Sequence, residues 1–272
     1  MNKFSDKRIF GPMPNYPLVK SYEPKDNKFT LISGPCSVES DLQINQIAKK
    51  ICKFGVTHLR GGVFSAGTFP SDKFGWKDIY LIQSFQNAAN QNGMKNIVEI
   101  LDYTERSFED ILKYADCVQI GARSMQNYTL LKKAAEFGKP VFLKRHPGST
   151  LDEFLGAAEY LLKYGCKELT LIERGSVSHT NHCRWDLSVS MIPAVKSITK
   201  IPIIGDPSHG TGRRDLVGPL ALACVAAGSD GLLIETHFDP DKSISDKEQA
   251  IHPDELELII NKVNKIRKVL NA

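Results

Sequence analysis

Reactive side chains recur where short apolar runs end along this 272-residue sequence. Four of them have the chemistry of metal ligands, namely Cys36, His209, Glu235 and Asp246. A thiolate, an imidazole and two carboxylates suit a borderline divalent ion such as Mn, Fe, Co or Zn, and they leave room on the ion for a substrate oxygen. Taken singly, they could be a buried cysteine, a capping histidine and two surface carboxylates. Cys36, His209 and Glu235 stand at or just after the ends of apolar runs, and Asp246 lies eleven residues after Glu235. Their expected location at one end of the strands favours a metal site.

A second set of residues in the same kind of position is cationic: Arg60, Arg123, Lys144 and Arg174. Arginine and lysine are usually solvated, but each of these stands at or just after the end of an apolar run. We count no matching excess of carboxylates beside them. The set therefore predicts an anionic ligand that carries phosphate and carboxylate groups.

The segment His179-x-x-His182-Cys183 looks like a third cluster. Its spacing is common by chance, and no fourth ligand is fixed by spacing. We predict a loop that contacts substrate and does not hold a metal ion.

These residues need a scaffold that brings the ends of many strands together. The strand-like runs are apolar throughout and do not alternate with polar residues, as in parallel strands that are covered on both faces. They span 29–35, 57–62, 96–102, 117–122, 140–145, 168–174, 201–208 and 230–237, and each precedes a segment of helical period. Several of these helices should end at a glycine: Gly55, Gly93, Gly138, Gly165 and Gly228.

Strands and helices in this rhythm predict a (β/α)8 TIM barrel, an α/β fold. A doubly wound open sheet is the alternative, but no Gly-x-Gly-x-x-Gly turn follows the first strand. In a barrel, chemistry takes place at the carboxyl ends of the strands, so both sets of residues would meet there. We expect a single catalytic domain over 29–272, preceded by a short N-terminal arm or hairpin over 1–28.

The composition excludes several classes of protein. Apolar residues make up 42% and charged residues 24%, as in an ordinary globular chain. The net charge is +4 and the basic residues are scattered, so we expect no nucleic-acid partner. The most apolar window, 216–234, is interrupted by glycine, proline and aspartate, so we expect no membrane span. Six cysteines without a CxxC pair, and no signal peptide, indicate reduced thiols in a cytoplasmic protein.

Several short motifs occur in order along the chain: GPCSVES, LRGG, QIGARSMQN, FLKR, IERG, DPSHGTGRRDLV and GLLIETH followed by SISD. Together they resemble the 3-deoxy-7-phosphoheptulonate (DAHP) synthase family, in its compact form related to 3-deoxy-octulosonate-8-phosphate synthase. The resemblance covers roughly residues 30 to 250. It implies condensation of phosphoenolpyruvate with erythrose 4-phosphate, which is the first step of the shikimate pathway to aromatic amino acids.

The resemblance also implies roles for individual residues. The four candidate metal ligands would hold the divalent ion, and the four cations would hold phosphoenolpyruvate. We place Cys36, Lys144 and His209 among the catalytic residues and count Thr68 and Asp206 among those that bind substrate. The expected partners are phosphoenolpyruvate and an aldose phosphate, and the expected assembly is a homodimer or homotetramer.

One segment departs from the family pattern. Where the family has Lys-Pro-Arg-Thr-Ser-Pro, this chain has Ser65-Ala66-Gly67-Thr68-Phe69-Pro70, which lacks both cations. In one explanation Lys73, Lys77 or Arg184 supplies the missing charge. In another, the acceptor is a different aldehyde in a specialised sugar or secondary-metabolite pathway. A non-catalytic barrel that binds a phosphometabolite is a third possibility, although a binding protein needs no open metal site.

Overall fold

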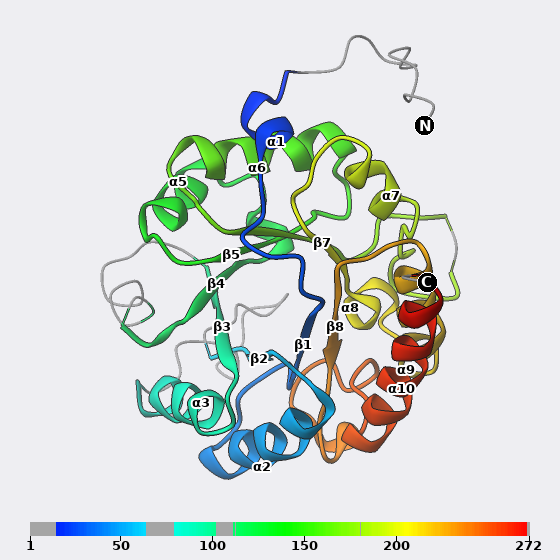
Figure 1. The fold of residues 1–272 in the computed structure, drawn as a ribbon. Helices are drawn as coiled ribbons and strands as arrows, with labels where there is room; N and C mark the ends of the chain where they lie inside the picture. Colours follow the sequence, from blue (N-terminus) through cyan, green and yellow to red (C-terminus); the bar gives the residue numbers. More distant parts are fainter. Residues whose placement is uncertain (1–14, 64–78, 102–110, 112, 180, 271–272) are drawn as a thin grey trace.

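The chain forms a closed barrel of eight parallel strands in the order β1 to β8 (Figure 1). This computed structural model describes residues 15–63, 79–101, 111, 113–179 and 181–270. Strand β1 pairs with β8 from Thr30 opposite Gly231 to Gly34 opposite Glu235, and this pairing closes the sheet. The predicted barrel is confirmed and the open sheet is excluded. The strands are β1 (Thr30–Gly34), β2 (His58–Arg60), β3 (Lys95–Ile100), β4 (Cys117–Ile120), β5 (Val141–Lys144), β6 (Leu169–Glu173), β7 (Ile203–Gly205) and β8 (Gly231–Glu235).

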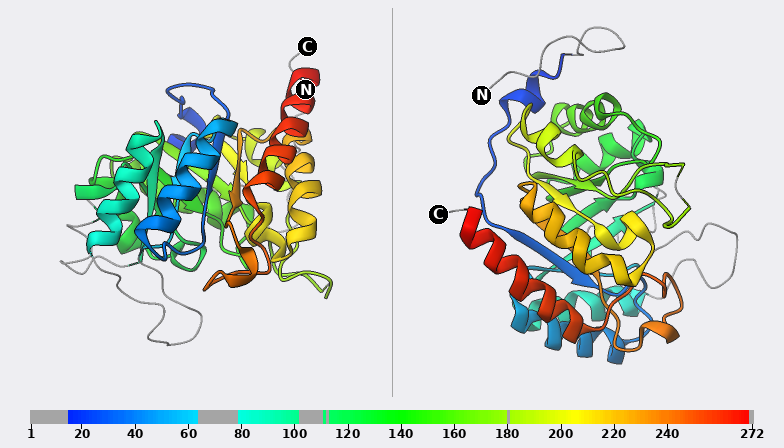
Figure 2. Two further views of the ribbon diagram at one scale, coloured as in Figure 1. Left: turned by 90° about the horizontal axis from the view of Figure 1, so that it is seen from below. Right: turned by 90° about the vertical axis from the view of Figure 1, so that its right-hand side faces the viewer.

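Helices surround the strands on the outside of the barrel (Figures 1 and 2). They are α2 (Asp41–Ile51), α3 (Ile79–Gln91), α5 (Tyr128–Glu136), α6 (Leu151–Lys163), α7 (Met191–Lys196), α9 (Arg214–Ala226) and α10 (Pro253–Leu270), with short 3-10 turns η1 (Cys52–Phe54), η2 (Ala122–Ser124) and η3 (Pro240–Lys242). The short helix α8 (Pro207–Thr211) instead follows directly on the carboxyl end of β7. The five glycines expected at helix ends all have positive φ, as left-handed caps require. Among the described residues, no helix has both the length and the apolar character to cross a membrane.

The described part of the predicted N-terminal arm, 15–28, contains the short helix α1 (Pro17–Ser21) and then runs to β1. Helix α1 lies against α6 (Figure 1). The Glu159 carboxylate on α6 accepts hydrogen bonds from the backbone N–H groups of Leu18 and Val19, at 3.1 and 2.8 Å. These N–H groups belong to the first turn of α1, where a helix has no intrahelical acceptor.

The barrel has an apolar centre that is separate from the layer between strands and helices. Seven strands each contribute one buried residue to this centre: Ile32, Ile97, Cys117, Phe142, Ile172, Ile204 and Leu233. A larger cluster fills the space between the outward faces of the strands and the helices. The chain therefore buries apolar side chains on both faces of these seven strands, which explains the unbroken apolar runs in the sequence.

A polar layer lies directly above the apolar centre, at the carboxyl ends of the strands. Side chains alternate across a strand, so the residue two positions after each central residue points into the same space. For β1 and β3 to β8 these residues are Gly34, Glu99, Gln119, Lys144, Arg174, Asp206 and Glu235, and β2 adds Arg60. Side-chain alternation along the strands thus places charged and polar groups together in one layer, which forms the floor of the barrel mouth.

Candidate active site

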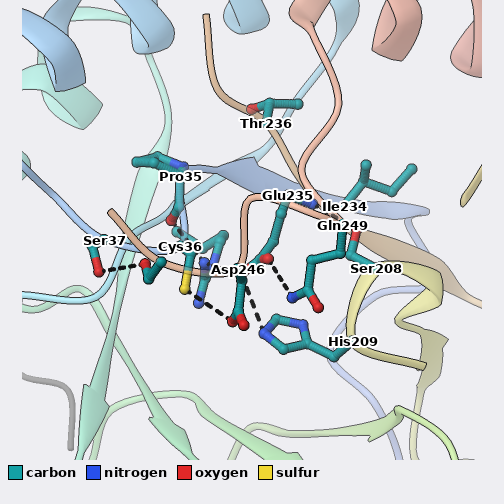
Figure 3. A network of polar contacts seen from close by, with 12 residues as sticks. Pro35, Cys36, Ser37, Ser208, His209, Ile234, Glu235, Thr236, Asp246 and Gln249 are labelled. Atoms are coloured by element: carbon teal, nitrogen blue, oxygen red, sulfur yellow. Dashed lines mark hydrogen bonds and ion pairs between the residues drawn. The ribbon is translucent and has the colours of Figure 1, made fainter. Parts of the chain in front are cut away.

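Three of the four candidate metal ligands converge at the carboxyl ends of β1 and β8. Cys36 follows β1, Glu235 ends β8, and Asp246 lies in the loop before α10. One donor atom from each lies within 4.8 Å of the other two, and Cys36 Sγ is 3.2 Å from Asp246 Oδ2 (Figure 3). His209, on α8, places Nε2 3.2 Å from Glu235 Oε1. The structure therefore groups three of the four predicted ligands, and His209 lies next to the group through its contact with Glu235.

Asp206 orients the imidazole of His209. It caps the N-terminus of α8, where its Oδ1 accepts a hydrogen bond from the His209 backbone N–H at 3.0 Å. Its Oδ2 lies 2.8 Å from Nδ1 of the same histidine. Because Nδ1 faces Asp206, Nε2 is left to face Glu235. A carboxylate that fixes a histidine through Nδ1 is the usual arrangement behind a metal-ligating Nε2.

Glu235 is fully buried and surrounded by donors. Its Oε1 accepts from Arg60 Nη1 at 2.6 Å, and its Oε2 accepts from Gln249 Nε2 at 2.6 Å. Burial alone would raise the pKa of Glu235, but His209 and Arg60 outweigh it and lower the pKa to about 2. The side chain is therefore a carboxylate at neutral pH. The same carboxylate, together with Asp206, raises the pKa of His209 against the effect of burial.

Cys36 behaves differently from the two carboxylates. Burial, and next the charges of Glu235 and Asp246, raise its thiol pKa well above the ordinary value. The thiol thus keeps its proton at neutral pH and donates it toward Asp246. A divalent cation would displace that proton and bind the thiolate.

This donor set fits a divalent transition ion. Ligand bonds of about 2.0–2.3 Å place donor atoms up to about 4–5 Å apart across the ion, which is the spacing of this cluster. Nε2 of His209 and Oε1 of Glu235 both have lone pairs, so their close approach needs a proton or a cation between them. A mixture of sulfur, nitrogen and oxygen donors favours Mn, Fe, Co or Zn over Mg or Ca.

The cations of the second set do not form a patch of uncompensated charge, which corrects the sequence-based count. Arg60 pairs with Glu235, and Lys144 Nζ lies 3.1 Å from Asp206 Oδ2 and 3.4 Å from His209 Nδ1. The polar layer holds Arg60, Lys144 and Arg174 against Glu99, Asp206 and Glu235, so its positive and negative side chains are equal in number. The count made from the sequence left out the carboxylates that the same strands supply, while the anionic ligand itself stays a prediction.

Arg174 and Arg123 are placed differently from the two paired cations. The guanidinium of Arg174 is buried 5.6 Å from the centroid of the Trp185 ring, and burial lowers its pKa. Arg123 lies on η2 with an exposed side chain. An anion that enters the mouth would therefore meet Arg174 at the floor.

A buried ion pair supports the two inward cations from behind. Arg145 directly follows Lys144, and Glu173 directly precedes Arg174. Because side chains alternate along a strand, Arg145 and Glu173 point away from the mouth. Arg145 Nη2 donates to Glu173 Oε1 at 3.0 Å, and the same oxygen accepts from the backbone N–H of Gly175 at 2.8 Å. The pair ties the end of β5 to the loop after β6.

Three polar residues of the site were not found from the sequence: Glu99, Gln119 and Gln249. Gln119 Nε2 donates to Glu99 Oε2 at 3.2 Å, and both side chains belong to the polar layer. The alternation of side chains along a strand could have predicted Glu99 and Gln119, because each stands two residues after an apolar residue of the barrel centre. Gln249 lies in a loop, and no sequence signal distinguishes it.

Two other predicted groups have different outcomes. Within the described residues, the one grouping of three or more potential metal ligands is that of Cys36, Glu235 and Asp246, so His179, His182 and Cys183 do not form such a site there. Thr68, the altered segment 65–70, Lys73 and Lys77 lie outside the described residues.

Comparison with known proteins agrees with this geometry. The sequence model of the DAHP synthetase I family matches residues 16–272. A phospho-2-dehydro-3-deoxyheptonate aldolase from Thermotoga maritima is 38% identical over 244 residues, covering 90% of this chain and 70% of the relative. A 2-dehydro-3-deoxyphosphooctonate aldolase from Desulfotalea psychrophila is 29% identical, covering 87% of this chain and 89% of the relative. The crystal structure of the Thermotoga maritima DAHP synthase superposes with a TM-score of 0.85 at 37% identity, covering 90% of this chain and 71% of that one.

Proposed function

The chain belongs to the DAHP synthetase I family, and on that premise we propose that it condenses phosphoenolpyruvate with erythrose 4-phosphate. The products are 3-deoxy-7-phosphoheptulonate and inorganic phosphate. The chain is a phosphoenolpyruvate-dependent enzyme that forms a carbon–carbon bond. The observation that best supports a catalytic site is the cluster of Cys36, His209, Glu235 and Asp246 beside the cations Lys144 and Arg174.

In the reaction, C3 of phosphoenolpyruvate forms a bond to the aldehyde carbon of the acceptor. Water adds to C2, and phosphate then leaves by cleavage of the C–O bond. Cys36, His209, Glu235 and Asp246 would hold the proposed metal ion, which would supply Lewis acidity toward the aldehyde oxygen. We propose Mn, Fe, Co or Zn as the ion, because of the sulfur, nitrogen and oxygen donors.

The protein's own side chains bind and orient the phosphoenolpyruvate. Arg174 offers its buried guanidinium to the phosphate or carboxylate group, where a charge-assisted contact is strong because water is excluded. Lys144 is held between Asp206 and His209, so its ammonium group can point at substrate oxygens and donate a proton to them. Arg60 and Arg123 complete the predicted cation set, with Arg60 also fixing Glu235.

A second candidate changes only the acceptor. The segment Ser65-Ala66-Gly67-Thr68 lacks the two cations of the family pattern, which favours an aldehyde other than erythrose 4-phosphate. The chemistry on phosphoenolpyruvate would be the same. A non-catalytic barrel is not favoured, because it would not need the metal-ligand cluster.

The test is to incubate the metal-loaded protein with phosphoenolpyruvate and a panel of aldehydes that includes erythrose 4-phosphate. Loss of the enol and release of phosphate are followed, and the product is identified by mass spectrometry. Cys36→Ala should lose both metal and turnover. Cys52→Ala, which alters a half-buried thiol on η1, is the matched control and should keep both. Full turnover after chelation, with elemental analysis showing no metal, would contradict the metal-dependent mechanism.

We also propose a cytoplasmic location and a homodimer or homotetramer. The six free cysteines support the first, because thiols usually stay reduced in the cytosol. Sedimentation equilibrium of the purified full chain tests the second.

A further inference from the structure

The segment Arg184–Leu187 forms part of the rim above the polar layer. Its backbone is anchored on both sides: Arg184 N–H donates to Thr211 O at 2.8 Å, and Ser176 and Asp186 exchange two backbone hydrogen bonds of 2.9 and 3.0 Å. The segment is thereby tied both to the loop after β6 and to α8.

Glycines let this segment lie directly against its neighbours. A Cβ on Gly175 would lie 2.8 Å from Trp185 Cβ, and one on Gly212 would lie 3.0 Å from Arg184 Cβ. Both distances are shorter than ordinary carbon contacts, and both glycines have positive φ. The positions of Arg184 and Trp185 are therefore built into the fold.

Two arginines lie near the Trp185 ring: the guanidinium of Arg174 is 5.6 Å from the ring centroid, and that of Arg184 is 6.0 Å from it. Arg174 belongs to the buried floor, whereas the Arg184 side chain is 45% exposed. The Arg174 guanidinium thus lies deep in the mouth of the barrel, and the Arg184 guanidinium lies nearer the surface.

The ion pair of Arg184 is weak. Its Nη1 lies 3.6 Å from Asp246 Oδ1, beyond hydrogen-bond distance, and both side chains are partly exposed. Such a pair contributes little to stability and can exchange its partner for an anion. By contrast, Arg60 and Lys144 hold buried carboxylates at 2.6 and 3.1 Å.

The charge balance of the mouth points the same way. The polar layer has equal numbers of cationic and anionic side chains, so it cannot by itself neutralise two phosphorylated substrates. Arg184 is a rim cation that lies beside Asp246, a candidate ligand of the proposed metal, and its partner can be displaced. It is placed to meet the far end of an acceptor whose aldehyde lies at the metal-ligand cluster.

We propose that Arg184 binds the phosphate group of the acceptor and so determines that the enzyme prefers a phosphorylated aldose. This inference rests on the proposed function and goes beyond it by naming a specificity-determining residue. Arg174 would bind phosphoenolpyruvate, and the Trp185 ring would hold the side chains of Arg174 and Arg184 in position.

The test compares erythrose 4-phosphate with erythrose in the wild type, Arg184→Ala, Arg184→Lys and Arg213→Ala. Arg213 is the matched control, because it is similarly exposed but is paired with Asp215 at 3.0 and 2.6 Å. In Arg184→Ala we expect kcat/KM for erythrose 4-phosphate to fall about 10- to 100-fold, the usual loss for a charge-assisted contact. The value for erythrose and the KM for phosphoenolpyruvate should change less than about threefold, and Arg184→Lys should retain part of the preference.

A second measurement applies if erythrose reacts too slowly. Erythritol 4-phosphate has no aldehyde and should inhibit competitively against erythrose 4-phosphate, with an inhibition constant that rises in Arg184→Ala and stays constant in Arg213→Ala. Metal content is measured for every variant, because Arg184 lies beside Asp246.

Three results would overturn the inference: equal losses for both aldoses, a loss expressed in the KM for phosphoenolpyruvate, or no loss at all. If the wild type makes no product from erythrose 4-phosphate, the proposed acceptor is wrong. The comparison is then repeated with the aldehyde that reacts and its phosphorylated or unphosphorylated form. Exclusive use of an unphosphorylated aldehyde would refute the role of Arg184.

Discussion

Replacing Gln249 by leucine should weaken metal binding although Gln249 is not a candidate ligand. The side chain is 2% exposed, and its Nε2 donates to Glu235 Oε2 at 2.6 Å (Figure 3). Arg60 occupies the other oxygen, Oε1, from the opposite side. Leucine has a similar size but no donor, so one oxygen of a buried carboxylate would lose its partner while the packing volume is kept.

The magnitude follows from the environment of Glu235. A buried acceptor without a partner costs about 1–3 kcal/mol, which should appear in the unfolding of the metal-free protein. A group that orients a metal ligand typically changes metal affinity by about 10- to 100-fold. We therefore expect the dissociation constant for a divalent ion to rise by about that factor in Gln249→Leu. The pKa of Glu235 would rise from about 2, because Gln249 is one of the groups that lower it, but the carboxylate would stay charged at neutral pH.

The assay is competition for the metal ion between the protein and a chelator of known affinity, followed by absorbance, with urea unfolding of the metal-free protein in parallel. Gln119→Leu is the matched control, since the Gln119 amide donates to Glu99, which is not a candidate ligand. The control should lose stability but keep its metal affinity. An unchanged affinity in Gln249→Leu, or an equal loss in the control, would show that Gln249 does not position Glu235 for the metal.

Three further substitutions test other parts of the structure. Arg174→Ala should raise the KM for phosphoenolpyruvate more than about tenfold in steady-state assays, because it removes a buried cation from the anion; an unchanged KM would assign Arg174 elsewhere. Burial lowers the pKa of His58 to about 4 in the folded protein. As the pH falls from about 6.5 toward 4, His58 therefore binds a proton in the unfolded chain before it does in the folded one, and the free energy of unfolding falls by up to about 3 kcal/mol. Urea unfolding across this range should show a flatter pH dependence in His58→Gln, and an unchanged slope would contradict this origin. Gly34→Ala would place a Cβ 2.0 Å from Arg60 O at φ 145 and should destabilise the barrel by about 3 kcal/mol or more, whereas a stability equal to wild type by thermal unfolding would show that the strands can separate there.

The barrel could be predicted because its strands have an unambiguous pattern. Runs such as IPII and GLLI are apolar at every position, which happens when both strand faces are buried. The strands themselves are shorter than the runs: β7 covers Ile203–Gly205 within the predicted 201–208. The difference arises because the chain leaves the sheet at Asp206 to cap α8, and the sequence does not show which polar residue ends the ladder.

The site was predictable in its residue types but less so in its pairing. Cys36, His209, Glu235 and Asp246 were expected together; the structure groups Cys36, Glu235 and Asp246 and places His209 3.2 Å from Glu235, while their role as metal ligands stays a prediction. Which carboxylate each cation pairs with could not be derived from the sequence. It depends on which side chains of each strand point into the barrel and on the register between neighbouring strands. The altered acceptor segment was identified from the sequence alone, since it lies outside the described residues.

Asp206 joins the two halves of this site, and it would allow the proposed metal ion and the proposed anion to bind in one small mouth. Its carboxylate fixes Nδ1 of His209, which turns Nε2 toward the metal-ligand cluster, and it also holds the ammonium group of Lys144. The charges of His209 and Lys144 outweigh burial and lower the pKa of Asp206 well below its ordinary value, so it stays charged while it serves both partners. A positive charge placed on the Nε2 side of His209 would strengthen the Nδ1–H bond to Asp206, and Lys144 would then be held less tightly by that carboxylate and be more available to an incoming anion. Metal binding and phosphoenolpyruvate binding should therefore favour each other through a single buried carboxylate.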